Sequence, residues 1–394
     1  MKKYTLAWTA KIGALIAVAL VMVALDACKK DDPPPTDDRD NDLVAIPYNP
    51  VAYTIPKPAK FPAVPVPTDN PVTVDGIQLG RRLFYDPILS ADSTQSCSSC
   101  HLPAGSFTDN KAVSTGIDGI PGRRSSMSLL NIAYVSRRLF WDGRSPSLED
   151  QALRPVEDPI EMHNTWANVL DRLRKHASYP AYFRKAFGIT SRKEITKELA
   201  AKAMAQFERI LISSGKSKFD LYLNGDPDAL DEEELDGKLM FFDEGGPVGL
   251  PDAQCFHCHG GITNTGAGFF NNGLDSVASL NDFTDKGLGE VTGNVNDNGR
   301  FAAPTLRNIA LTAPYMHDGR FKTLEEVVEH YGKNGKGVSN EDPFIRQIGF
   351  PVPGTNPIKY SGLTPYQKKV IVRFLHTLTD TDFINNPDIN NPFQ

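Results

Sequence analysis

Two copies of one short motif constrain this chain more than any other feature. The first copy reads CSSCH over residues 97–101 and the second reads CFHCH over residues 255–259. A Cys-x-x-Cys pair alone is also compatible with a zinc site, a redox dithiol or disulfides. Cys-x-x-Cys-His is the attachment sequence of a c-type haem, because two thiols add to its vinyl groups and the next imidazole binds the iron. The motifs therefore predict two covalently bound haems, held by Cys97, Cys100 and His101 and by Cys255, Cys258 and His259.

The segments before the two motifs repeat each other. Gly80–Asp86 reads GRRLFYD and Gly237–Asp243 reads GKLMFFD, with the Asp 11 and 12 residues before the first Cys of each motif. Apolar residues recur at helical spacing in residues 195–212 and 370–378, and little of the chain alternates with period two. We therefore predict an all-α chain of two cytochrome c-like domains, with long loops and little β structure.

The N-terminal residues indicate export. Met1-Lys2-Lys3 and an apolar run end at Ala27-Cys28, which resembles a bacterial lipoprotein signal in which Cys28 is acylated. The alternative, an uncleaved membrane helix, would need a longer apolar run. We expect a periplasmic or cell-surface lipoprotein, anchored to the membrane through Cys28.

The predicted organisation has five parts. It comprises a signal peptide (1–27), a Pro/Asp-rich tether (28–70), an N-terminal cytochrome c domain (71–232), a C-terminal one (233–384) and a tail (385–394). With 42 basic and 48 acidic side chains the net charge is −6, and no long basic block is present, so nucleic acid is not an expected partner.

Several further motifs occur in one order along the chain. Phe140–Arg144 reads FWDGR, Glu161 precedes a Met, and Leu306–Gly319 reads LRNIALTAPYMHDG. From about Val74 to about Asp380 the chain resembles the bacterial di-haem cytochrome c peroxidases and their MauG relatives. The resemblance implies that hydrogen peroxide reacts at the N-terminal haem and that the C-terminal haem relays electrons.

The resemblance also implies roles for individual residues of the N-terminal site. Glu161 matches the family's distal carboxylate, Gln151 a pocket amide, and Trp141 the tryptophan between the haems. Ile117 stands where classical peroxidases have a removable histidine ligand, so this haem is expected to be open without prior reduction. The alternative ligands are His163 and His176.

For the C-terminal haem, the resemblance implies Tyr331 as the sixth ligand, as in MauG-like proteins, where classical peroxidases have methionine. Met316 and His330 are competing candidates. The backbone carbonyls of Thr312 and Pro314 match a calcium site between the domains, with Ser125 where the family has asparagine.

The expected function is therefore that of a di-haem cytochrome c peroxidase, with an external electron donor such as a small cytochrome c or cupredoxin. The alternatives are a MauG-like oxidase acting on a protein or small molecule, a non-catalytic electron-transfer cytochrome, and a haem-based sensor or docking module. A homodimer is compatible with the sequence, which leaves the oligomeric state open.

Overall fold

Side-chain caps that the sequence supplies begin most of the helices. Thr73 caps α2 (Val74–Tyr85) and Thr196 caps α6 (Lys197–Glu208), each with its hydroxyl accepting a backbone N–H bond from the first turn. Thr364, followed by Pro365 in the first turn, caps α12 (Pro365–Thr377) with a full capping box. These caps fix where short helices start between long loops.

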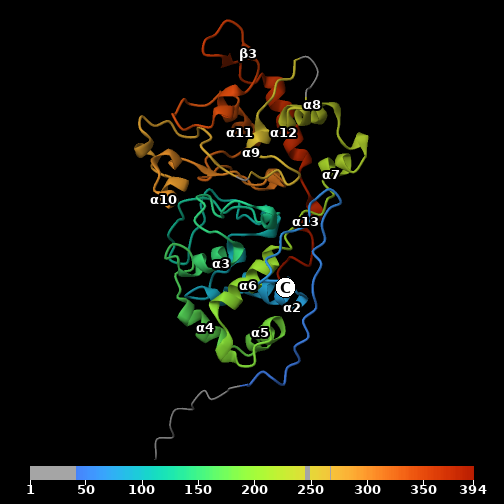
Figure 1. Cartoon of the computed structure of the whole chain (residues 1–394), viewed down its shortest axis with the longest axis vertical. Coiled ribbons are helices and arrows are strands. Elements are labelled where there is room, and N and C mark those ends of the chain that lie inside the picture. The colour runs from blue at the N-terminus through green and yellow to red at the C-terminus, as the bar shows by residue number, and fades with distance from the viewer. Residues whose placement is uncertain (1–40, 245–248, 267) are drawn as a thin grey trace, which may run out of the picture. The chain divides into compact units, whose positions relative to one another are not determined.

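The computed structural model describes residues 41–244, 249–266 and 268–394. The predicted signal peptide, Cys28 and the first part of the predicted tether lie outside the described residues. Leu43–Gln394 form one unit, which contains two lobes (Figure 1). Within the described ranges, no helix has the length and apolar character needed to cross a membrane.

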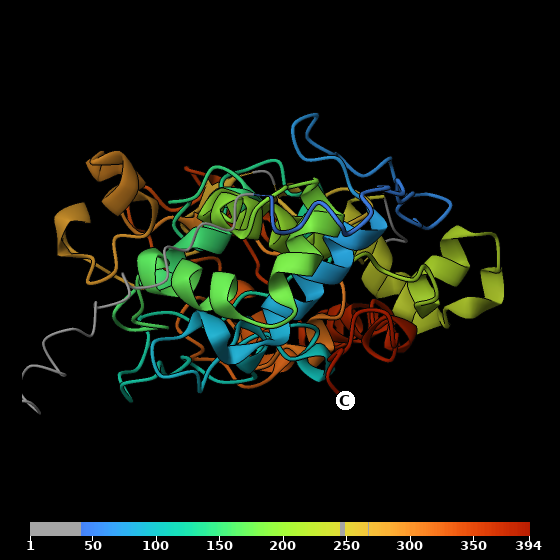
Figure 2. The ribbon, with the colours of Figure 1, turned by 90° about the horizontal axis from the view of Figure 1, so that it is seen from below.

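The N-terminal lobe is built on α2 and α6, which lie against each other in the view from below (Figure 2). Gly80 makes this approach possible, since a Cβ there would stand 1.9 Å from the carbonyl oxygen of Ala203. The other helices of this lobe are α3 (Leu148–Glu157), α4 (Trp166–Lys175) and α5 (Tyr179–Phe187).

The C-terminal lobe repeats this arrangement with α8 (Glu232–Phe242) against α12. Gly237, the repeat partner of Gly80, would place a Cβ 2.0 Å from the carbonyl oxygen of Val370. The duplicated sequence therefore encodes the same close helix contact twice. The remaining helices of this lobe are α7 (Lys218–Leu223), α9 (Cys255–Cys258), α10 (Leu288–Thr292) and α11 (Leu324–Tyr331).

Strands are short and few in the described ranges. β1 (Phe269–Phe270) pairs antiparallel with β2 (Phe301–Ala302), and β3 (Pro351–Val352) with β4 (Lys359–Tyr360). Two apolar cores, one around α2, α5 and α6 and one around α8, α11 and α12, hold the lobes together. The predicted all-α class with little β structure is confirmed.

The C-terminal residues return to the N-terminal lobe. After α13 (Thr381–Ile384), the carbonyl of Ile389 accepts a 2.8 Å bond from the Tyr85 hydroxyl, and that of Asn390 a 2.6 Å bond from Arg81 Nε. The predicted tail is thus packed on α2. The domain limits at 232 and 384 stay predictions.

Candidate active site and haem pockets

The first Cys-x-x-Cys-His motif lines a cavity in the N-terminal lobe. His101 Nδ1 donates a 2.8 Å hydrogen bond to the carbonyl oxygen of Phe107, which leaves Nε2 free to bind a metal. Cys97, Cys100 and His101 all face a cavity of about 450 Å³. Burial lowers the pKa of His101, which favours the neutral imidazole that an iron requires.

The second motif is built in the same way. His259 Nδ1 donates a 3.0 Å bond to the carbonyl oxygen of Pro304, and burial lowers the pKa of His259 to about 4. Cys255, Cys258 and His259 line a cavity of about 170 Å³. The four thiols form no disulfide. An apolar cavity beside two free thiols and an imidazole with a free Nε2 fits a c-type haem in both lobes.

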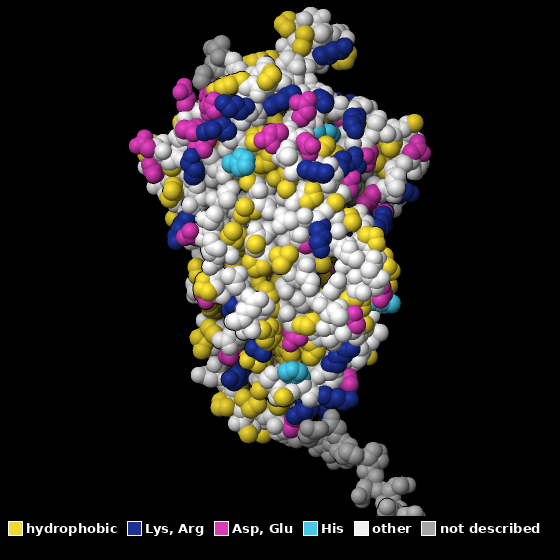
Figure 3. All heavy atoms as spheres, turned by 180° about the vertical axis from the view of Figure 1, so that it is seen from behind, with side chains coloured by type: hydrophobic (Ala, Val, Ile, Leu, Met, Phe, Trp, Pro, Cys, Tyr) yellow, Lys and Arg dark blue, Asp and Glu magenta, His cyan; other side chains and the backbone are white. Residues whose placement is uncertain are grey.

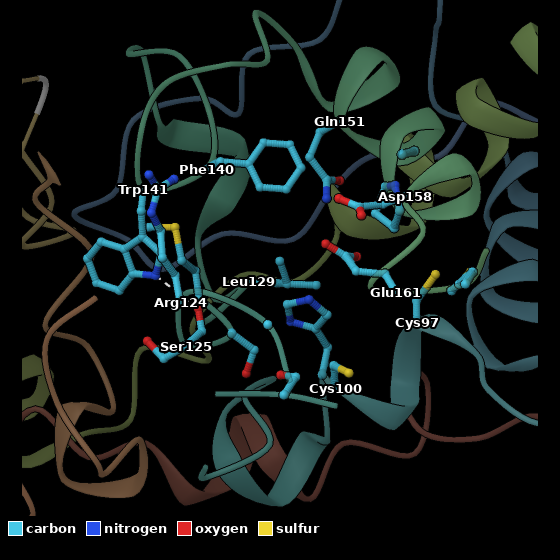
Figure 4. A pocket seen from close by; sticks show the side chains of 18 of the residues that line it. Cys97, Cys100, Arg124, Ser125, Leu129, Phe140, Trp141, Gln151, Asp158 and Glu161 are labelled. Atoms are coloured by element: carbon cyan, nitrogen blue, oxygen red, sulfur yellow. Dashed lines mark hydrogen bonds between the residues drawn. The ribbon is translucent and has the colours of Figure 1, made fainter. Parts of the chain in front are cut away.

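Glu161 projects into the first cavity. Gln151, from α3, and Asp158, from the turn after α3, point toward it (Figure 4). Hydrogen bonds from the Glu161 amide to Asp158 O (3.0 Å) and from the Met162 amide to Pro155 O (3.1 Å) hold this turn. Burial raises the pKa of Glu161 to about 7; the Asp158 charge adds to the shift and Arg144 opposes it. A carboxyl with this pKa can both accept and donate a proton near neutrality.

The alternative ligands for the first haem do not face the cavity. His163 Nδ1 lies 2.5 Å from Asp118 on the surface, and His176 Nδ1 accepts a 3.1 Å bond from the Ser178 amide. Ile117 donates its amide to Glu161 O (3.0 Å) and does not line the cavity. Of the described residues that line it, His101 is the one histidine.

Sequence reasoning did not identify Glu208, which also lines the first cavity. Its side chain is 5 % exposed, Oε2 has no hydrogen-bond partner, and burial raises its pKa to about 8. Met204 and Ala200, one and two turns earlier on α6, are buried as well. A charged residue on the buried face of a helix was the signal that could have identified it.

Trp141 lines both cavities. Its indole N–H donates a 2.9 Å hydrogen bond to the carbonyl of Ser125, and its ring meets His317 edge-on at 6.5 Å between centroids. No other described residue lines both cavities. Trp141 therefore lies where the two cavities meet, and its predicted role between two haems stays a prediction.

A second internal repeat explains the contact between Trp141 and His317. NIA at 131–133 recurs at 308–310, and FWDGR at 140–144 corresponds to MHDGR at 316–320. The two Asn residues share a left-handed conformation (φ 60° and 61°), as do Phe140 (65°) and Met316 (75°). Trp141 and His317 are thus equivalent residues of two similar turns. This repeat was readable in the sequence and was missed.

Paired charges connect the lobes at the rim of the first cavity. Arg124, with a side chain 10 % exposed, pairs with Asp142 of its own lobe and with Asp285 of the other at 2.7 Å. Arg123 pairs with Glu290 of α10, also at 2.7 Å. Because Glu290 lines the cavity, part of its wall comes from the C-terminal lobe.

Tyr331 and Met316 both line the second cavity together with His259. Asn272 Nδ2 lies 3.3 Å from Tyr331 Oη and 3.4 Å from Met316 Sδ. His330 does not line the cavity, because its Nε2 donates to the Asn272 carbonyl at 3.0 Å. Of the three candidate ligands, the structure therefore places two beside the second cavity.

The residues of the predicted calcium site lie where the lobes meet. The Ser125 hydroxyl donates to the carbonyl of Met316 at 3.0 Å, and the Thr312 hydroxyl donates to Ile309 O at 3.0 Å. Among the described residues, no cluster of three or more His, Cys, Asp or Glu side chains could hold a metal ion. Carboxylate ligands are therefore not gathered there.

Comparisons with known proteins agree on one family. The family described as di-haem cytochrome c peroxidase matches residues 74–228. The cytochrome-c peroxidase IdrP1 of Pseudomonas sp. (strain SCT) is 31 % identical over 359 residues, covering 84 % of this chain and 88 % of the relative. The cytochrome c551 peroxidase of Nitrosomonas europaea is 36 % identical over 275 residues, covering 70 % of this chain and 78 % of the relative.

A solved structure is similar over nearly the same range. The crystal structure of a MauG-like protein associated with microbial copper homeostasis has a TM-score of 0.76 and 33 % identity, covering 87 % of this chain and all of that one. The methylamine utilization protein MauG of Methylorubrum extorquens is 34 % identical over 276 residues, covering 70 % of this chain and 73 % of the relative.

Proposed function

Because this chain belongs to the di-haem cytochrome c peroxidase and MauG family, we propose that it reduces hydrogen peroxide to water in the cavity beside His101. The family carries two c-type haems and is periplasmic. Here Cys97 and Cys100 would hold one haem, and Cys255 and Cys258 the other. When bound, the haems supply the iron that exchanges electrons with peroxide and with the donor.

The observation that carries the proposal is the Glu161 carboxyl inside the first cavity, with its pKa raised to about 7. As a carboxylate, Glu161 takes the proton of one peroxide oxygen. As a carboxylic acid, it delivers that proton to the other oxygen, so that the O–O bond breaks with water as the leaving group. Two electrons from the donor and two protons in total give two molecules of water.

Gln151 and Trp141 would support this chemistry from opposite sides. The Gln151 amide, which faces the same space as Glu161 (Figure 4), can orient peroxide by hydrogen bonding. Trp141 lines both cavities, and its polarisable indole would carry electrons between them. His163 and His176 face away, which supports a pocket that peroxide enters without prior reduction.

The test is the EPR and absorption spectrum of the ferric protein as isolated, followed by hydrogen peroxide without a reductant. We expect one high-spin and one low-spin haem and a rapid response to peroxide. In Glu161→Gln the rate at which the N-terminal haem reacts with peroxide should fall by about 10²-fold or more. Glu157 is an exposed carboxylate on α3, and Glu157→Gln should leave this rate unchanged. Two low-spin haems whose spectra do not change on addition of peroxide would overturn the proposal.

A MauG-like oxidase is the second candidate function. Tyr331 beside the second cavity favours it, because an anionic phenolate stabilises oxidised iron better than methionine does. A peroxidase would be turned over by a small reduced cytochrome c or cupredoxin. If neither donor supports turnover while peroxide still oxidises added phenols or protein side chains, the oxidase is the better description. Sedimentation of the same preparation tests whether the chain forms a homodimer, which the sequence leaves open.

We further propose a lipid anchor on Cys28. The proposal is supported by the apolar N-terminal run and the small residue before Cys28. Detergent phase partitioning should place the native protein in the detergent phase and Cys28→Ser in the aqueous phase. Equal partitioning of both would contradict it.

A calcium ion held by the carbonyls of Thr312 and Pro314 is a separate proposal. Both residues lie in the loop that Asn110 binds, through 2.7 and 2.9 Å bonds to Leu311 O and Ala313 O. Chelation should then lower the thermal midpoint and readdition of Ca²⁺ should restore it. An unchanged midpoint together with no calcium by elemental analysis would exclude the ion.

A further inference from the structure

A second side chain able to bind iron faces the second cavity next to Tyr331. The thioether of Met316 lines this cavity, and Asn272 Nδ2 lies within hydrogen-bond reach of both Met316 Sδ (3.4 Å) and Tyr331 Oη (3.3 Å). An amide group carries two N–H donors, so it can hold both acceptors at once. The phenolic oxygen and the sulfur are therefore placed around one donor group.

The backbone of Met316 is held by the fold. Its φ of +75° lies in the left-handed region, which a methionine adopts only where its surroundings impose it. Ser125 supplies two of the constraints. Its hydroxyl donates to Met316 O (3.0 Å) and its amide to His317 O (2.7 Å). Such strain, held by specific hydrogen bonds, is typical of functional positions.

The internal repeat gives an independent reason why position 316 faces a haem. Its equivalent is Phe140, which shares the left-handed backbone and points its ring into the first cavity (Figure 4). A phenyl ring has no lone pair for iron. In the C-terminal lobe the same position carries a thioether, which is a ligand of haem iron.

Two histidines, His330 and His317, lie near these side chains. His330 Nε2 donates to the Asn272 carbonyl, and the His317 ring stacks on Phe301 with 3.6 Å between centroids. His317 also lines the cavity. Tyr331 and Met316 are distinguished from it because both lie within hydrogen-bond reach of the Asn272 amide group, and this shared contact favours them as the two candidates for a sixth ligand.

We propose that Met316 is an alternative to Tyr331 as the sixth ligand of the C-terminal haem. Met316 binds the iron when reduction releases Tyr331. This inference rests on the haem assignment in the proposed function. Phenolate is a hard anion that prefers ferric iron, whereas a thioether is soft and neutral and prefers the ferrous state. One electron from the donor reduces the iron, the phenolate takes one proton from solvent and leaves, and a sulfur lone pair replaces it.

The experiment compares near-infrared magnetic circular dichroism, EPR and resonance Raman spectra of Tyr331→Phe, Met316→Leu and the double variant. In ferric Tyr331→Phe we expect a low-spin C-terminal haem with a sulfur-to-iron charge-transfer band. In the double variant that band should vanish and the haem should become high-spin. If the spectra of the single Tyr331→Phe variant and the double variant coincide, the inference is overturned.

The native redox couple is tested with Met316→Leu alone. We expect an unchanged ferric tyrosinate spectrum, a lower reduction potential of the C-terminal haem, and loss of the low-spin ferrous spectrum. A ferrous spectrum identical to that of the native protein would refute the exchange. Met240→Leu, in the core of α8 and outside the cavity, is the matched control and should change none of these signals.

These readouts are separate from the proposed function. Haem content per chain reports whether each variant is loaded and folded, and the response of the His101 haem to peroxide reports the proposed reaction. If peroxide fails to react while the charge-transfer band still depends on Met316, the function is wrong and the ligand assignment stands. If peroxide reacts and the band does not depend on Met316, the ligand assignment is wrong and the proposed function stands.

Discussion

At the scale of single residues, Glu208 is a buried carboxyl with unusual electrostatics. It ends α6, where the helix dipole disfavours an anion, and Oε2 has no partner. Arg209 pairs instead with Glu149, at 2.7 Å. Burial therefore raises the Glu208 pKa from 4.5 to about 8, so the folded protein keeps a proton that the unfolded chain releases.

The sign of the pH effect follows. Between pH 4.5 and 8 the unfolded state binds fewer protons, so the free energy of unfolding falls with pH, by on the order of 3–5 kcal/mol. Glu208→Gln cannot ionise and should become more stable than the native protein as pH rises from 5 to 8, as measured by urea unfolding. Glu198→Gln, exposed on the same helix, should show no such trend. If the difference in free energy of unfolding between Glu208→Gln and the native protein does not change with pH, Glu208 does not have a raised pKa.

At the scale of elements, the two helix contacts at Gly80 and Gly237 should be equally intolerant of a side chain. A Cβ would lie 1.9 and 2.0 Å from backbone carbonyl oxygens, which cannot move without separating the helices. We expect Gly80→Ala and Gly237→Ala each to lower the free energy of unfolding by about 2 kcal/mol or more.

The control for these two substitutions is Gly122→Ala, whose Cβ would meet its nearest neighbour, Ser114 O, at an ordinary 3.4 Å. It should change the free energy of unfolding by less than about 0.5 kcal/mol. Equal effects at all three positions, measured by urea unfolding with haem content as a check, would mean that the close helix contacts are not what these glycines provide.

The elements also show what sequence could and could not predict. The haem motifs, the Gly80/Gly237 repeat and the Thr364-Pro365 cap rest on local spacing, and each has its counterpart in the structure. The family resemblance is confirmed by relatives above 30 % identity.

Other features depend on contacts between distant segments. Asn272 reaches Tyr331 across 59 residues, and Arg124 reaches Asp285 across 161. No helical or strand period in the sequence reports such pairs. The roles proposed for Glu161, Gln151, Trp141 and Tyr331 came from the resemblance and stay predictions.

At the scale of the whole molecule, buried charge holds the lobes together. The surface in Figure 3 mixes acidic and basic side chains without a broad patch of one sign, whereas Arg124 is enclosed between Asp142 and Asp285. In Arg124→Ala, Asp142 would keep Arg144 at 3.2 Å and Asp285 would keep Arg123 at 3.8 Å, but both would lose their most buried partner. We expect the free energy of unfolding to fall by up to about 3 kcal/mol.

Arg123→Ala is the matched control for this prediction. Its side chain is 57 % exposed, pairs with Glu290 at 2.7 Å and lies 3.8 Å from Asp285, so its loss should lower the free energy of unfolding by at most about 1 kcal/mol. Urea unfolding measures both variants. Similar costs for the two, or a strong salt dependence of the Arg124 effect, would show that the interlobe pair is solvent-screened.

Trp141 is the residue through which the two cavities should communicate. In Trp141→Phe the indole is replaced by a smaller ring, and the hydrogen bond to Ser125 O is lost. Since Glu161 and His101 remain, the first response of the N-terminal haem to peroxide should keep its rate. The later absorption change, which reports oxidation of the C-terminal haem, should become slower than in the native protein, because electrons must cross a longer gap.

Stopped-flow absorption after rapid mixing with peroxide separates the two phases. Trp166→Phe provides the comparison, because Trp166 is buried on α4, donates its N–H to Leu153 O at 3.1 Å and lines neither cavity. It should lower stability and leave both rates intact. If instead both Trp variants slow the second phase equally, or neither slows it, electron transfer between the lobes does not depend on the indole of Trp141.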